Sequence, residues 1–334
     1  MRNFKETQTT DNLFGFMSGL ISQEPIYVIG HINPDTDSIC SAMAYVDLKA
    51  QLQQYNYIAC RLGEINRETR FVLDYFDVPG PALIENVSGK SVVLVDHNEE
   101  AQSAKGRVNA KIIEIIDHHR IANLETFEPI YITMEPLGST ASIIFKKYLD
   151  NKLLPSKEMA GLLLSAVLSD TLVLTSPSCT NEDKYFANNL SGLAEIKDYE
   201  AFGLDILKAG AALEGLTAEE ILATDRKKYI FGDIVSYISQ IKTFHIAQIL
   251  ADEKSLTQAM EDYLHKTKGN LAVLMVTDLT ENSSYLFIAG EGAPLVHSAF
   301  GKKSSCIYLQ NTVSSKMQII PQLTKTVIST RKDI

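Results

Sequence analysis

The chain has 334 residues, of which 45% are hydrophobic and 22% charged, and its formal net charge is -10. This length allows two domains with separate cores, and the composition is that of a soluble globular protein. The acidic balance excludes a general nucleic-acid-binding surface, which needs a basic footprint. No apolar run is long enough to span a membrane. Four widely spaced cysteines without a C-x-x-C pair are typical of reduced thiols, so we expect a cytoplasmic protein.

Residues 1–24 are expected to form a short extension that packs on the body of the protein or on a partner subunit. Positions 12–22 are apolar and follow Lys5, as in a signal peptide. The segment nevertheless lacks a small-residue cleavage site and leads directly into the first predicted strand.

The segment 26–29 is a short β-branched run that predicts a strand. His31, Asp35 and Asp37 follow it within a few positions, and Ser38 is the expected N-cap of a helix that reaches residue 52. Alone, this is an acidic turn beside a helix N-terminus, which is common without any metal.

The same pattern recurs along the first half of the chain, where further apolar runs end in acidic or imidazole side chains. The run 92–95 ends in Asp96, His97 and Asn98, the run 112–116 ends in Asp117, His118 and His119, and the run 162–168 ends in Asp170. Strands of a parallel sheet end on one edge, and a helix packed on that sheet can deliver its last residue there, so we expect these side chains to converge.

The chemistry of the converging side chains indicates a metal site. Carboxylates mixed with imidazoles, without thiolates, suit Mn²⁺, Mg²⁺ or Co²⁺ better than a structural zinc. A site with this many carboxylates can hold two ions and act on both sides of a phosphoryl displacement.

The alternation of strands and helices predicts an α/β protein with an N-terminal doubly wound parallel sheet. We predict a metal-binding domain over residues 25–207, a hinge at the Gly- and Ala-rich residues 208–215, and a smaller α+β domain with a mixed sheet over residues 216–334. The active site is expected in the cleft between the two domains.

In the second half, the patterns predict two helices, a hairpin and five further strands. The expected elements are helices over 217–227 and 253–266, a hairpin over 229–239, and strands over 244–249, 271–276, 284–288, 306–309 and 318–320.

Positive charge for a phosphate substrate would come from Lys227 and Lys316, although either could instead be a solvated surface lysine. Arg120 is expected to make a structural ion pair.

The motifs GHINPDTDSICSA, VDHNE, IDHHRIAN and LSDT resemble those of the family II inorganic pyrophosphatases of the DHH phosphoesterase superfamily. The resemblance extends from residue 26 to the C-terminus. It implies a homodimer joined by an edge strand, a pair of Mn²⁺ or Co²⁺ ions, and Mg²⁺ that accompanies the substrate, pyrophosphate. No nucleic-acid or membrane partner is implied.

The resemblance also assigns roles by position. His31 and Asp35 would bind one ion, Asp37 and His118 the other, Asp96 would bridge them, and Asp170 would be the remaining ligand. The substrate would be bound by His119, Lys227, Lys316, Asn98 and Ser315, and Asp117 and His97 would orient the ligands.

The chain departs from the family near the C-terminus. Where the family has a Ser-Arg-Lys-Lys-Gln motif, this chain has Ser315 in place of the Arg and Met317 in place of the second Lys, while Lys316 is retained. Serine cannot form the bidentate contact that arginine makes with phosphate. Two alternatives therefore stay open: another phosphoesterase of the superfamily, acting on oligonucleotides, cyclic dinucleotides or polyphosphate, and a weakened paralogue that binds metal and phosphate without efficient turnover.

Overall fold

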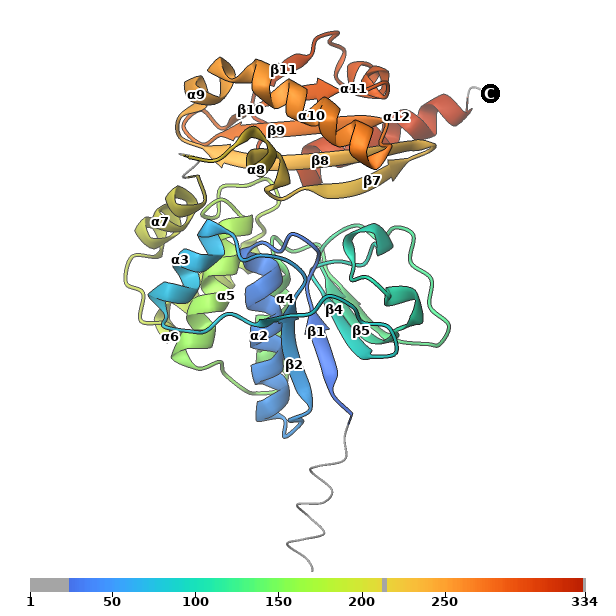
Figure 1. Ribbon diagram of the computed structural model, residues 1–334. Coiled ribbons are helices and arrows are strands. Elements are labelled where there is room, and N and C mark those ends of the chain that lie inside the picture. The colour runs from blue at the N-terminus through green and yellow to red at the C-terminus, as the bar shows by residue number, and fades with distance from the viewer. Residues whose placement is uncertain (1–23, 212–214, 333–334) are drawn as a thin grey trace, which may run out of the picture.

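The computed structural model describes residues 24–211 and 215–332, which form two α/β domains, each built on its own sheet (Figure 1). The predicted N-terminal extension lies, apart from Glu24, outside the described residues. Within the described ranges, no helix is long and apolar enough to cross a membrane. The α/β class and the smaller mixed-sheet second domain are confirmed.

The first domain is built on a six-stranded parallel sheet with the order β3-β2-β1-β4-β5-β6. Its strands are β1 (Ile26–Ile29), β2 (Tyr57–Arg61), β3 (Ala82–Leu83), β4 (Ser91–Val95), β5 (Lys111–Asp117) and β6 (Tyr131–Met134). The strand order reverses between β1 and β4, which are paired in parallel. In open α/β sheets, ligands bind at the carboxyl ends of the strands at such a reversal. The fold therefore places the loops after β1 and β4 side by side at the position expected for a site.

Helices cover one face of this sheet, and short 3₁₀ turns lie among the connections on the other. The helices are α2 (Thr36–Gln51), α3 (Arg67–Tyr75), α4 (Thr140–Asp150), α5 (Lys157–Asp170), α6 (Asn181–Leu193) and α7 (Tyr199–Ala211), and the turns are η1 (Glu100–Gln102) and η2 (Arg107–Asn109). The main core lies between the sheet and α2, α4 and α5, and includes the fully buried Tyr45, Phe145 and Tyr148.

The start of α2 differs from the prediction. The N-cap is Asp35 and not Ser38: the Asp35 Oδ1 accepts a hydrogen bond from the Ser38 amide at 2.9 Å. The Ser38 hydroxyl instead accepts from the His31 amide at 3.0 Å. Aspartate and serine are equally good caps, so propensity alone could not choose between them.

The second domain has a five-stranded mixed sheet with the order β11-β10-β9-β8-β7, in which only the β8–β9 pair is parallel. Its strands are β7 (Lys227–Phe231), β8 (Ile234–Thr243), β9 (Leu271–Asp278), β10 (Ser283–Ala289) and β11 (Cys306–Leu309). The helical elements are α8 (Ala218–Ala223), α9 (Ile246–Ala251), α10 (Glu253–Thr267), α11 (Ala293–Phe300), the π-helical turn η3 (Ser315–Ile319) and α12 (Ile320–Lys332). One face packs on α11 and α12, and the other on α8, α9 and α10.

Two predicted strands of this domain are wrong. Residues 244–249 lead into α9, and residues 318–320 lie in η3 and at the start of α12. In the second case, Ile319 and Leu323 are buried at helical spacing, with Val327 packed against the same core. A short apolar run does not distinguish a strand from the end of a buried helix.

The connection between the domains follows α7. Residues 208–211 of the predicted hinge are helical, and residues 212–214 lie outside the described residues. The domains also meet directly, because the Asn33 amide donates to the Arg226 carbonyl at 2.7 Å and Leu172, Leu207 and Val313 form a shared apolar cluster. The exact division at 208–215 stays a prediction.

Candidate metal centre

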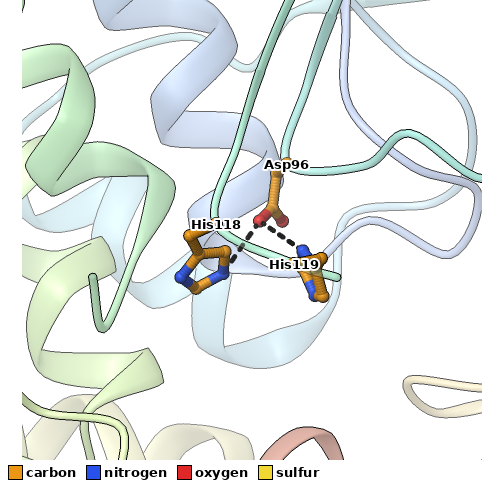
Figure 2. A group of neighbouring side chains, drawn as sticks. All are labelled: Asp96, His118 and His119. Carbon is orange, nitrogen blue, oxygen red and sulfur yellow. Dashed lines mark ion pairs between the residues drawn. The ribbon is translucent and has the colours of Figure 1, made fainter. Parts of the chain in front are cut away.

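The structure brings all six predicted metal ligands together at the carboxyl edge of the first sheet. The donor atoms form three overlapping groups, and within each group the atoms lie within 4.8 Å of one another. The groups are His31, Asp35 and Asp96; Asp37, His118 and Asp170; and Asp96, His118 and His119. Asp96 belongs to two of these groups, as Figure 2 shows for its contacts with His118 and His119. The convergence predicted from the ends of the apolar runs is therefore present.

Asp96 lies between the two histidines that begin the other loops. Its Oδ2 is 3.3 Å from the His31 Nε2, and its Oδ1 is 3.3 Å from the His118 Nε2. Its backbone has a positive φ of 59°, a conformation that aspartate tolerates better than most side chains. The sharp turn after β4 thus points this carboxylate into the middle of the cluster.

Backbone carbonyls fix which nitrogen of each histidine is available. The Nδ1 of His31 lies 2.9 Å from the Ile32 carbonyl, and the Nδ1 of His118 lies 2.9 Å from the Leu137 carbonyl. A carbonyl can only accept, so Nδ1 carries the proton in each ring and Nε2 is left for a ligand. The His31 Nε2 is buried and has no hydrogen-bond partner of acceptable geometry. An imidazole held in this way is typical of a metal ligand.

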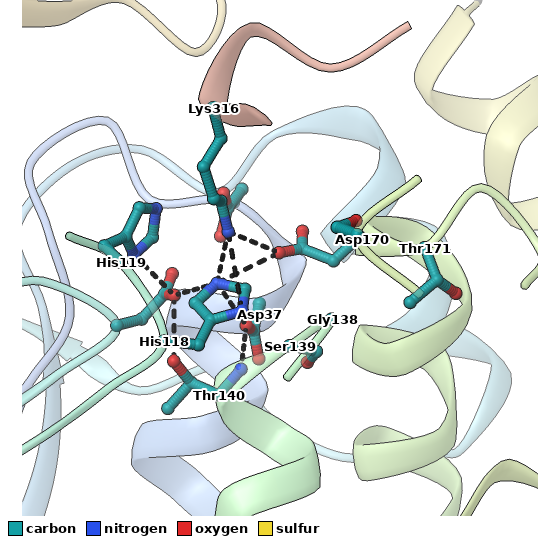
Figure 3. A network of polar contacts seen from close by, with 12 residues as sticks. Asp37, His118, His119, Gly138, Ser139, Thr140, Asp170, Thr171 and Lys316 are labelled. Carbon is teal, nitrogen blue, oxygen red and sulfur yellow. Dashed lines mark hydrogen bonds and ion pairs between the residues drawn. The ribbon is translucent and has the colours of Figure 1, made fainter. Parts of the chain in front are cut away.

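The N-terminus of α4 holds two of the carboxylates. Asp37 accepts a hydrogen bond from the Thr140 amide at 2.7 Å (Figure 3). It also accepts from the Ala141 amide at 2.9 Å, and the Thr140 hydroxyl donates to Asp96 at 3.1 Å. The free N–H groups and the dipole of a helix N-terminus stabilise negative charge. Thr140 is thus a supporting residue that we did not predict.

The electrostatics of the cluster show an excess of negative charge. Burial raises the pKa of Asp37 well above its ordinary value, and the neighbouring Asp96 and Asp170 raise it further. Burial and Lys227 oppose protonation of His31, but Asp35 and Asp96 outweigh them and raise the pKa of His31 to about 10. A cluster that retains protons in this way is suited to binding cations, which supply the missing positive charge. Together with the buried His31 Nε2, this shows that the donor set fits divalent metal ions.

Asp117 orients His119 at the end of β5. The Asp117 Oδ1 lies 2.8 Å from the His119 Nδ1 and accepts from the His118 and His119 amides. Burial and the Lys316 ammonium lower the pKa of His119 to about 3, so the ring is neutral. Because Nδ1 donates to Asp117, Nε2 is available to a ligand.

Two predicted residues form their hydrogen bonds with groups other than the predicted metal ligands. Asn98 donates to Asp117 at 2.7 Å and to the Arg120 carbonyl at 2.8 Å, and its oxygen accepts from the Ala122 amide. These bonds hold the loop after β5, and the role of Asn98 in substrate binding stays a prediction. The ring nitrogens of His97 contact the Val95 carbonyl and the Ser103 hydroxyl.

The second domain faces the cluster across a cavity of about 490 Å³. Asp35, His119 and Asp170 line it from the first domain, and Lys227, Ser315 and Lys316 line it from the second. Lys227 is buried and its Nζ lies 3.2 Å from Asp225 and 3.8 Å from Asp35.

The side chain of Arg120 lies 3.3 Å from that of Glu99, which confirms the predicted ion pair.

Lys316 enters the cluster from η3. Its Nζ contacts the His118 Nε2 and lies 3.6 Å from the Asp170 Oδ2 (Figure 3). The ammonium is therefore held among the donor atoms of the group formed by Asp37, His118 and Asp170. A positive charge from the second domain reaches this group directly.

Comparison with known proteins agrees with this geometry. The DHH family, N-terminal domain, matches residues 25–167, and the DHHA2 domain matches residues 204–326. A protein of Bacillus velezensis is 41% identical over 308 residues, which cover 91% of this chain and 99% of that protein, and one of Bacillus cereus is 41% identical over 306 residues, covering 90% and 98%. Each is named as a probable manganese-dependent inorganic pyrophosphatase.

This chain belongs to the family II, manganese-dependent inorganic pyrophosphatases. A crystal structure of a Methanococcus jannaschii protein named as a member of the same family superposes with a TM-score of 0.85 at 35% identity and covers 91% of this chain and 99% of that one. The family resemblance predicted from the four motifs is confirmed, as is the two-domain arrangement around the cleft.

Proposed function

We propose that this protein is a manganese-dependent inorganic pyrophosphatase that hydrolyses diphosphate to two phosphates. The observation that carries the proposal is the arrangement of two donor groups around the shared carboxylate of Asp96, opposite lysines from a second domain. Metal and positive charge on opposite sides of a cavity are what phosphoryl transfer requires, because its transition state spreads negative charge over the phosphoryl oxygens. The curated relatives carry the same activity in their names.

The metal ligands are assigned from the two groups. His31 and Asp35 would hold one Mn²⁺ ion, Asp37, His118 and Asp170 would hold the other, and Asp96 would serve as a ligand in both groups. Co²⁺ fits the same donors, and Mg²⁺ accompanies the substrate. When bound, such ions lower the pKa of water toward neutrality and neutralise phosphate charge.

The residues of the chain position the reactants and neutralise charge. Hydrolysis adds the elements of water across the P–O–P bridge: hydroxide bonds to one phosphorus, the bond to the bridging oxygen breaks, and the electron pair leaves with the second phosphate. Lys227 and Lys316 bind the phosphoryl oxygens on which negative charge increases. His119, oriented by Asp117, binds the same oxygens once the negative charge of the substrate protonates its ring, because only then does Nε2 carry a hydrogen to donate.

The protein is further proposed to form a homodimer through β6, the edge strand of the first sheet. Tyr131 on this strand is 79% exposed, and the nearby Phe127 is 93% exposed. An unpaired edge with exposed apolar side chains favours pairing with a second copy. Light scattering should give twice the mass of one chain, and Ile132→Lys on the same strand should give a monomer. A wild-type monomer would contradict the proposal.

The four cysteines are unpaired, two of them buried, which agrees with the proposed cytoplasmic location. Free thiols of this kind are typical of proteins in a reducing compartment.

One assay tests the activity against the two alternatives. Purified protein with Mn²⁺ is offered pyrophosphate, tripolyphosphate and a short oligonucleotide. Phosphate released from pyrophosphate alone supports the proposal. Nucleotide release would instead favour another activity of the superfamily. Tight Mn²⁺ binding without any product would favour a phosphate-binding paralogue weakened at Ser315.

A further inference from the structure

The second domain presents a third lysine to the cavity, Lys242 on β8, which none of the sequence patterns identified. It lines the same cavity as Asp170, Ser315 and Lys316. Its Nζ donates to the Ser169 carbonyl at 3.2 Å, one residue before the metal ligand Asp170. The ammonium therefore lies at the margin of the metal cluster, in the gap between the two domains.

The register of the second sheet places Lys242 in a row with the other two lysines. Lys227 is paired with Ile238 across the β7–β8 ladder, so it shares a sheet face with Ile238, Gln240 and Lys242. The Gln240 Oε1 accepts from the Ser315 amide at 3.1 Å, which fixes the start of η3 beside this face. The order along the face is thus Lys227, then the Lys316 segment, then Lys242.

The row follows the metal cluster from one end to the other. Lys227 lies 3.8 Å from Asp35 in the first donor group, and Lys316 lies 3.6 Å from Asp170 in the second. Lys242 comes next, beyond Asp170. A diphosphate whose reacting phosphoryl group lies over the metal cluster therefore has room to extend its other phosphate toward Lys242.

Lys242 is free to bind an anion because it gives up little in doing so. The Ser169 carbonyl already accepts from the Leu172 amide at 3.3 Å and from the C-cap amide of α5. In the part of the chain that the structure describes, Lys242 has no ion pair with a carboxylate, whereas Lys227 has two and Lys316 has one. When the ammonium moves to a ligand, no buried group is left without a partner.

The position of the missing family arginine carries no positive charge of its own. Ser315, which replaces that arginine, has a short neutral side chain, and its amide is bonded to Gln240 two residues from Lys242. Lys302, a basic residue near the C-terminus, donates to the Tyr308 carbonyl and does not line the cavity. Arg67, at the start of α3, also lines the cavity, but it belongs to the first domain, whereas Lys242 lies on the strand that holds the Ser315 amide. A charge-assisted contact to the departing phosphate beside position 315 can therefore come from β8.

We infer that Lys242 is a substrate-binding residue that contacts the oxygens of the leaving phosphate and supplies the charge missing at position 315. As the P–O bond breaks, its electron pair stays on the leaving phosphate, and the Lys242 ammonium offsets the negative charge that increases there. This assignment rests on the proposed pyrophosphatase activity.

The test is the charge-removing substitution Lys242→Gln in the full-length protein with saturating Mn²⁺. A hydrogen bond to a charged group is worth about 1.5–3 kcal/mol, so kcat/KM for pyrophosphate should fall about 10- to 100-fold. The affinity for imidodiphosphate, a non-hydrolysable diphosphate, should fall by a similar factor in calorimetry, and the Mn²⁺ affinity should not change. Lys228→Gln is the matched control, because Lys228 is the next residue on β7 and alternates to the other face of the sheet.

A double substitution adds a second readout. If Lys242 and an arginine at 315 serve the same phosphate, Ser315→Arg should raise kcat/KM at least about 10-fold more in the Lys242→Gln background than in the wild type. Equal gains in both backgrounds would overturn the inference. So would a Lys242→Gln variant within twofold of an active wild type, or one that loses Mn²⁺ affinity. A wild type that releases no phosphate from pyrophosphate would overturn the proposed function, and the assignment of Lys242 with it.

Discussion

The substitution Asp96→Asn tests the bridging role directly, because it removes one negative charge while nearly preserving the shape of the side chain. Asp96 is 1% exposed, and its two oxygens lie 3.3 Å from the Nε2 atoms of His31 and His118. It is the member shared by the donor groups around those two histidines.

The magnitude follows from the donor count. In Asp96→Asn one of the two oxygens becomes an NH₂ group, which has no lone pair for a metal, so one of the groups around His31 and His118 loses a donor atom and both lose negative charge. Loss of a residue that merely orients a ligand weakens metal binding by about 10- to 100-fold. Loss of a direct donor should therefore weaken Mn²⁺ binding at this group by at least about 100-fold, or about 2.8 kcal/mol. Pyrophosphate hydrolysis should fall by more than about 100-fold, as when one stabilising group of an active site is deleted.

Calorimetry with Mn²⁺ and phosphate release at saturating pyrophosphate measure the two effects. The control is Glu114→Gln, which removes a buried carboxylate that bonds to Tyr45 and Lys147 and does not line the cavity. Glu114→Gln should keep its Mn²⁺ affinity. An Asp96→Asn variant that retains most of its rate, with an unchanged circular dichroism spectrum, would refute the bridging role.

Three further outcomes are expected. Ser315→Arg should raise kcat for pyrophosphate severalfold, since an arginine forks onto phosphate oxygens; an unchanged or lower rate in a phosphate-release assay would count against the assignment of this position. Gly138→Ala should reduce the free energy of unfolding by about 1–3 kcal/mol in urea titrations, because the added Cβ would lie 2.5 Å from the Thr171 Cγ2 and 2.9 Å from an Asp183 oxygen; a wild-type midpoint would contradict this. Removal of metal with EDTA should abolish activity and lower the melting temperature, and Mn²⁺ at about 100 times its Kd should restore about 2.7 kcal/mol of stability; a melting temperature indifferent to EDTA would be inconsistent with the metal site.

The metal half of the site was predictable because its residues follow short apolar runs. Asp96 and His118 come at or just after the ends of β4 and β5, and a parallel sheet necessarily brings such ends to one edge. Asp170 was predicted on the same argument from the end of a helix, and α5 delivers it. The motifs then separated these residues from ordinary acidic turns.

The supporting contacts were not predictable in this way, because they join segments far apart in sequence. Nothing near Thr140 indicates that its hydroxyl meets Asp96, and nothing near Lys242 indicates that β8 faces α5. The segment after Asp170 is a second example. Leu172, Val173 and Leu174 have φ values of 49°, 54° and 63°, a left-handed turn that costs about 1–2 kcal/mol per residue and that no propensity favours for these side chains.

Two local hydrogen bonds and one tertiary contact hold that turn. The Thr171 hydroxyl accepts from the Leu174 amide at 3.1 Å, the Val173 amide donates to the Leu168 carbonyl at 2.7 Å, and Leu172 is buried against Leu207 of α7. The resulting conformation reverses the chain immediately after Asp170, a proposed metal ligand. Strain of this kind is maintained by the surrounding structure and is invisible to local patterns.

Crystals grown with Mn²⁺ and measured at the manganese absorption edge give the most direct test of the account. Anomalous difference maps should show two peaks in each chain, one beside the His31 Nε2 and one beside the His118 Nε2, with the Asp96 carboxylate touching both. A single peak, or two peaks that do not share Asp96, would contradict the central claim.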